Sequence, residues 1–88
     1  MKSLIISYDL CGSEKNYTNL IERIKSYEIW AHITESTWFI KTDSSCIAVH
    51  NHLYGAMDRN DRLFVAELAR NAAWENAICS DQYLKNNL

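Results

Sequence analysis

Short apolar blocks and polar breaks alternate along this chain, and their spacing predicts a mixture of strands and helices. The first block, residues 4–9, is apolar and β-branched and stops at a carboxylate, which is typical of a strand that ends at a loop. Alternation in a strand places Leu4, Ile6 and Tyr8 on one face. Asp9 then lies at the end of the other face.

Two later segments have helical spacing. Apolar side chains recur at steps of three and four over residues 16–27 and again over 44–57, so each segment is expected to present one apolar face to a core. Asn16 is the expected N-cap of the first helix, and the polar cluster 43–45 supplies the N-cap of the second.

Three further segments, 29–34, 37–42 and 62–68, are rich in aromatic and β-branched residues and are predicted strands. The resulting order is β-α-β-β-α-β. With right-handed crossovers this order gives a ferredoxin-like α+β fold: a four-stranded antiparallel sheet with both helices on one face. The first strand is then central, and neither of the two helices covers the other face of the sheet.

The chain is expected to divide into a ferredoxin-like domain over residues 1–70 and a C-terminal extension over 71–88. The extension should pack on the sheet or on a partner. Its end is predicted to be a polar turn or short helix, with Ser80 as a cap and with Tyr83 and Leu84 as anchors.

Composition excludes several classes of protein. The 88 residues are 48% hydrophobic with a net charge of −2, which is typical of a folded domain and not of a protein that coats DNA. The three cysteines are widely spaced without a CxxC motif, so neither a zinc knuckle nor a redox motif is indicated. The short N-terminal apolar run is too brief for a signal peptide or a membrane span, and we expect a cytoplasmic protein with free thiols and no membrane partner.

Asp9 has two interpretations, as a strand terminator or as a metal-binding catalytic residue. A single carboxylate is a poor site for Mg²⁺, which takes several oxygen ligands. A catalytic Asp9 therefore requires a dimer in which two copies of Asp9 share one ion. Ser36 likewise either closes the turn between two strands or contacts a phosphate beside Asp9.

Other polar residues favour structural roles. His50 and His52 lie two apart on a predicted helix and point in different directions, while His32 lies within a strand, so no metal clamp is indicated. Asp58 and Asp61 fit a polar turn better than a calcium loop.

Three tryptophans are many for so short a chain. Core packing is their default role, but the uncovered sheet face offers another. Trp38 and Trp74 are the expected aromatic anchors of a dimer interface. Stacking of RNA bases is the alternative, although the basic and glycine-containing signature of RNA-binding sheets is missing.

Short motifs along residues 3–76 resemble the superfamily of the small CRISPR adaptation subunit. The likeness is closer still to short bacterial and phage proteins often labelled SinR-like, and the virulence-associated protein D toxins share the fold. The motifs are Tyr8-Asp9-Leu10, Ile24-Lys25-Ser26-Tyr27, Glu35-Ser36-Thr37-Trp38-Phe39-Ile40, Asp61-Arg62-Leu63-Phe64-Val65 and Ala72-Ala73-Trp74.

The resemblance implies a ferredoxin-like homodimer. In nuclease members the aspartate that matches Asp9 faces its twin and binds a divalent metal, magnesium or manganese, for phosphodiester hydrolysis, and the serine at the start of the third strand matches Ser36. Other members are structural subunits that bind nucleic acid. Nuclease and adaptation members usually have an arginine in the loop after the aspartate, whereas this loop holds only Lys15.

Because few basic residues surround Asp9, we expect a homodimeric interaction module that binds protein or nucleic acid in a defence or mobile-element context, such as defence against phage. The alternative is a metal-dependent nuclease, acting on RNA or DNA, that uses paired Asp9 carboxylates.

Overall fold

The computed structural model describes residues 1–11, 17–69 and 71–88. The elements in chain order are β1 (Lys2–Asp9), α1 (Thr18–Lys25), β2 (Ile29–Thr34), β3 (Thr37–Thr42), α2 (Cys46–Tyr54), β4 (Arg62–Glu67) and α3 (Asp81–Asn87). The first six follow the predicted β-α-β-β-α-β order, and α3 lies in the C-terminal extension.

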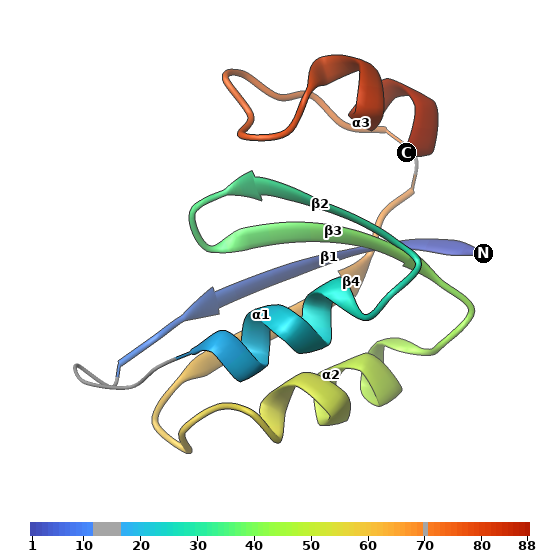
Figure 1. Cartoon of the computed structure of the whole chain (residues 1–88). Helices are drawn as coiled ribbons and strands as arrows, with labels where there is room; N and C mark the ends of the chain where they lie inside the picture. The colour runs from blue at the N-terminus through green and yellow to red at the C-terminus, as the bar shows by residue number, and fades with distance from the viewer. Residues whose placement is uncertain (12–16, 70) are drawn as a thin grey trace.

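The four strands form one antiparallel sheet in the order β2-β3-β1-β4. This is the ferredoxin-like arrangement, with β1 in the interior of the sheet, so the predicted fold class is confirmed. Figure 1 shows α1 and α2 together on one side of the sheet, and the extension with α3 on the other side, beyond β2.

The main core lies between the sheet and the first two helices. Leu4 and Ile6 of β1 are completely buried there, and Tyr8 is nearly so, as the alternation along the strand predicts. The helices contribute Leu20 and Ile24 from α1 and Val49 and Leu53 from α2. Burial of such side chains is the principal stabilising term for a chain of this length.

A second, smaller core lies on the opposite face of the sheet. Phe39 of β3 and Ala31 of β2 pack there against Leu84 of α3. The extension reaches this position by lying along the edge of β2, where the Ile78 amide donates to the Ile33 carbonyl at 2.9 Å and the Cys79 amide to the His32 carbonyl at 3.0 Å.

Both long helices are shorter than their apolar spacing predicts. The second begins after Ser45, whose hydroxyl accepts a hydrogen bond from the Ala48 amide, and it ends at Tyr54. Beyond that residue the Ala56 and Met57 amides bond three residues back, so the chain tightens into turns. The predicted cap Asn16 and the loop residue Lys15 lie outside the described residues.

The three cysteines are free thiols. Among the helices that the structure describes, none is long and apolar enough to cross a membrane.

Candidate functional site

Asp9 lies at the end of β1, directly opposite Arg62 at the start of β4. One carboxylate oxygen of Asp9 is 3.7 Å from the Arg62 guanidinium, and the two side chains are 68% and 75% exposed. A solvent-exposed pair of this kind is screened and contributes little to stability. Both charges are therefore available to a partner at this end of the sheet.

The structure brings Asp9 and Ser36 together. Both line a hollow of about 350 Å³, which Tyr8, Leu10 and Glu35 complete. The Tyr8 amide donates to the Ser36 carbonyl at 3.1 Å, and this bond holds the turn between β2 and β3 against β1. Since the described lining has two carboxylates and no basic side chain, it is a poor cradle for phosphate.

A second hollow, of about 140 Å³, lies on the other side of Asp9. Its lining includes Ser7, Arg62 and Phe64. Asp9 thus separates a hollow with two acids from one that has a guanidinium and an exposed aromatic ring.

The donors in one copy of the chain do not fit a divalent metal. Among residues 1–11, 17–69 and 71–88, no three histidine, cysteine or acidic side chains lie close enough together to hold an ion. Asp9 and Glu35 are the two carboxylates of the larger hollow, and Mg²⁺ prefers a more complete set of oxygen ligands. A metal at Asp9 would need a second copy to complete the site.

Asp61 is a structural residue of this region. Its side chain is buried, and one carboxylate oxygen accepts from the Cys11 amide at 2.7 Å and from the Tyr17 hydroxyl at 3.2 Å. The other oxygen accepts from the Asp58 amide at 2.8 Å. Asp61 thereby ties the chain that follows Asp9 to the turn before β4, which extends the turn role expected for it.

The structure corrects the expectation that Trp38 anchors a dimer. Trp38 pairs with Ile6 across β1 and β3, so its ring points to the helix side of the sheet and is only 2% exposed. Its indole Nε1 donates to the Tyr8 hydroxyl at 2.9 Å. Burial raises the pKa of Tyr8, the Trp38 hydrogen bond lowers it, and the charge of Glu35 raises it, with a net increase.

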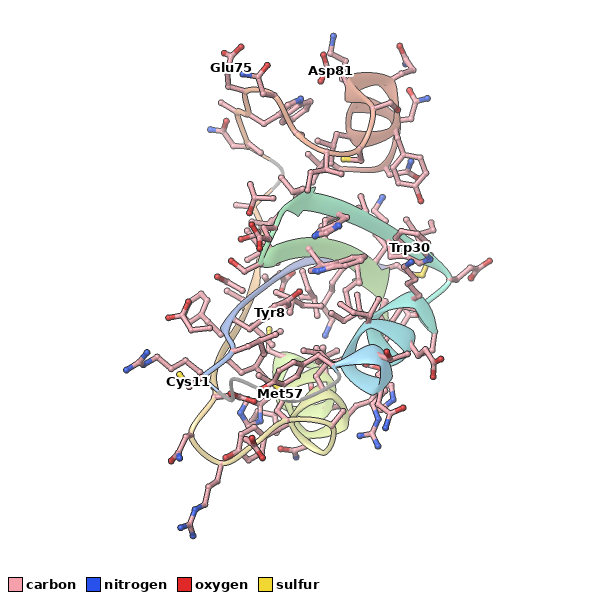
Figure 2. All side chains as sticks on the ribbon, turned by 60° about the vertical axis from the view of Figure 1, so that its left-hand side comes forward. Tyr8, Cys11, Trp30, Met57, Glu75 and Asp81 are labelled. Atoms are coloured by element: carbon pink, nitrogen blue, oxygen red, sulfur yellow. The ribbon has the colours of Figure 1, made fainter. Side chains whose placement is uncertain are left out.

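Trp74 lies in the extension and packs against the smaller core around Phe39 and Leu84. Its Nε1 donates to the Asp81 carboxylate at 3.0 Å. Figure 2 shows Asp81 and Glu75 at the end of the molecule opposite Cys11, and therefore far from the loop that follows Asp9. Trp38 and Trp74 thus belong to two different cores and do not form one surface.

The histidines are dispersed. His32 stacks on Trp38 with ring centroids 3.9 Å apart, and His52 accepts or donates a 2.9 Å hydrogen bond with the Tyr27 hydroxyl. Burial raises the pKa of Tyr27. His50 stacks on Tyr54. None of these three histidines lines either hollow beside Asp9.

The sequence predicts an uncovered sheet face, but it does not predict that Phe64 is the aromatic residue exposed on it. The apolar cluster beneath the extension contains residues of β2 and β3 but, among the described residues, none of β1 or β4. One half of that sheet face is therefore uncovered, and we call it the open sheet face, defined by Ile5, Ser7, Phe64 and Ala66. Phe64 is 64% exposed. Phe64 pairs with Ser7 across the two strands, so it shares this face with the polar side chain of β1.

The chain matches none of the protein-family models against which it was scanned, and searches of curated proteins and of solved structures return no match.

Proposed function

We propose that this chain is a small homodimeric interaction module that associates with a second copy through the open sheet face. The proposal rests on one observation, the 64% exposure of Phe64 in the middle of β4. A large aromatic ring on a partly apolar face is the usual anchor of a protein interface.

The surroundings of Phe64 support a self-complementary contact. Ile5 and Ala66 extend the apolar area, and Asp9 and Arg62 lie at one end of the same face. Two copies related by a two-fold axis present the same patch to each other, so an acid and a base on each copy allow reciprocal ion pairs at the rim. Such pairs would set the orientation of the dimer more than its affinity.

The mass of the purified chain in solution tests this proposal. Sedimentation or light scattering should give twice 10.2 kDa for the wild type, and Phe64→Ser should shift the population to monomer because the anchor is lost. Ile47→Ser is the matched control, since Ile47 is 74% exposed on α2, away from the open sheet face, and it should leave the dimer intact.

A wild type that is monomeric throughout the micromolar range would overturn the proposal. If Ile47→Ser dissociates the dimer and Phe64→Ser leaves it intact, the dimer interface lies on the helix side of the molecule.

We also propose a binding partner and a biological setting for the dimer. The likeness of the motifs around Asp9 and Ser36 to the superfamily of the small CRISPR adaptation subunit suggests that the dimer binds protein or nucleic acid in a defence or mobile-element setting. Pull-down from cells that carry mobile elements, with Phe64→Ser alongside, would test whether such binding depends on the dimer.

A metal-dependent nuclease is the second candidate, favoured by the single observation that Asp9 and Ser36 line the same hollow. RNA and DNA should then be cleaved with Mg²⁺ or Mn²⁺ by the wild type and by Asp43→Asn, whose exposed carboxylate lies elsewhere, but not by Asp9→Asn. Equal cleavage by the wild type and Asp9→Asn would identify a contaminating nuclease and remove this candidate.

A further inference from the structure

A groove lies between the edge of β2 and the C-terminal extension, away from the open sheet face. Its volume is about 480 Å³, larger than either hollow beside Asp9. β2 and β4 are the two outer strands of the sheet, so the groove and Phe64 lie at opposite edges. A cavity of this size accommodates a small organic molecule.

Four of the groups that build the groove already have hydrogen-bond partners. Ile78 and Cys79 donate their amides to β2, and the Ser80 hydroxyl accepts from the Tyr83 amide at 3.1 Å as the cap of α3. The His32 ring lies flat on Trp38, and its Nε2 donates to the Glu35 carbonyl at 3.1 Å. The lining therefore presents mainly apolar surface to an occupant.

No charged side chain of the described residues belongs to the lining of the groove. The nearest charges lie beside it: the Lys25 Nζ is 5.0 Å from the centre of the Trp30 ring, and Asp81 follows Ser80. Burial raises the pKa of the Cys79 thiol above its usual value, which keeps that group neutral at physiological pH. A charged molecule would lose its hydration in this groove without gaining an ion pair from the lining.

Two aromatic side chains from different elements line the groove, Trp30 from β2 and Tyr83 from α3. The indole Nε1 of Trp38 is bonded to Tyr8, and that of Trp74 to Asp81. By contrast, neither the Trp30 Nε1 nor the Tyr83 hydroxyl makes a hydrogen bond to the residues that the structure describes. Flat apolar walls with two unused polar atoms suit an aromatic molecule that bears an oxygen.

We infer that the groove between β2 and the extension is a binding site for a small, uncharged aromatic molecule that carries a hydrogen-bonding oxygen. The ring would pack against Trp30 and Tyr83, and the oxygen would bond to the Trp30 Nε1 or the Tyr83 hydroxyl. This site is independent of the proposed dimer interface.

Titration of ¹⁵N-labelled protein with 2-naphthol tests the inference, with decahydro-2-naphthol and 2-naphthalenesulfonate as the saturated and anionic counterparts. We expect 2-naphthol to bind with a dissociation constant on the order of 0.1 mM and each counterpart to bind at least about tenfold more weakly. The chain has three indole signals, and that of Trp30, assigned with Trp30→Phe, should shift most because Trp30 lines the groove.

Two variants locate the site. Ile78→Asp places a charge on an exposed wall of the groove and should weaken 2-naphthol binding at least about tenfold. Ile47→Asp, an equally drastic change at an exposed residue of α2, should leave binding unchanged. Phe64→Ser should also leave binding unchanged, which separates this site from the dimer interface.

If 2-naphthalenesulfonate binds more tightly than 2-naphthol, the inference that the ligand is uncharged is wrong. Shifts that centre on Ile5 and Phe64, or a shift of all three indole signals by similar amounts, would overturn the location. If Ile78→Asp releases the extension from β2, the wild-type pattern of indole shifts still decides the outcome.

Discussion

Asp61 lines neither hollow beside Asp9, but its hydrogen bonds hold the chain that follows Asp9. It is buried and accepts hydrogen bonds from Cys11, Tyr17 and Asp58. Through the Cys11 amide it fixes the direction in which the chain leaves Asp9. The position of Asp9 therefore depends on Asp61 as well as on the sheet register.

Replacement of Asp61 by alanine should lower the free energy of unfolding by about 2–3 kcal/mol, because backbone donors lose a charged acceptor in a part-buried place. Urea unfolding measures the loss. Asp43→Ala removes an exposed carboxylate and should change the free energy by less than about 0.5 kcal/mol. Equal effects of the two substitutions would contradict the structural role of Asp61.

Tyr8 provides a pH-dependent contribution to stability. Its pKa in the folded chain is raised above 10.0, so the folded state holds the phenolic proton more tightly than the unfolded state does. This contribution is fully present below pH 10 and is lost as the pH rises through the raised pKa. Tyr8→Phe should lower stability at pH 8 by about 1–3 kcal/mol because the Trp38 Nε1 loses its acceptor.

Unfolding in urea at pH 8 and pH 11 tests the pH dependence of the Tyr8 contribution and the loss of stability in Tyr8→Phe. The stability difference between wild type and Tyr8→Phe should shrink at the higher pH. Tyr54→Phe, at an exposed position on α2, should show no such convergence.

Among the elements, α3 depends most on tertiary contacts. Its seven residues are too few to form a stable helix alone, so the Ser80 cap and the buried Leu84 hold it in place. The extension as a whole is fastened by Leu84 against Phe39 and by the amides of Ile78 and Cys79 on β2.

Leu84→Ala should therefore loosen the extension and leave the domain folded. Hydrogen exchange of the Ile78 and Cys79 amides should accelerate at least about tenfold, while exchange within β1 changes little, because the sheet and its first two helices share a separate core. Lys85→Ala, on the exposed side of α3, is the control. Loss of protection in β1 would mean that the two cores unfold together.

The elements were easier to predict than their surfaces. All four strands lie within two residues of their predicted ends because alternation and β-branched composition are local signals. The helices are shorter than predicted, since apolar spacing continues into the turns that follow α2. Asp9 and Ser36 share a hollow because the end of β1 and the turn between β2 and β3 lie at the same end of the sheet.

The surface could not be predicted because it depends on register and on the path of the extension. Alternation along β3 places Trp38 and Phe39 on opposite faces, but the register of β3 with β1 decides which of the two faces the helices. The exposure of Phe64 follows from where the extension lies, and no local pattern specifies that path.

For the whole molecule, small size makes self-association valuable. A chain of 88 residues buries only about 60–65% of the surface that its unfolded form exposes, so an added interface raises its stability appreciably. The open sheet face is the surface on which the proposed second copy would provide this burial.

If the dimer is the folded unit, the melting temperature should rise by about 3–5 °C for each tenfold increase in protein concentration. Calorimetry over a hundredfold range measures this rise. Phe64→Ser should melt at a temperature that does not change with concentration, and Ile47→Ser should behave as the wild type does. A wild-type melting temperature that is constant over this range would argue for a monomer.

The two bonds from Ile78 and Cys79 to β2 also limit how copies of this chain can assemble. A sheet with two bare edges can add strands at both and grow into a fibre. Here the extension blocks hydrogen bonding along part of one edge, so pairing through backbone groups is left mainly to the β4 side. A subunit with one surface for self-association forms closed dimers, whereas a subunit with two such surfaces can form open filaments. The C-terminal extension is thus a safeguard against polymerisation.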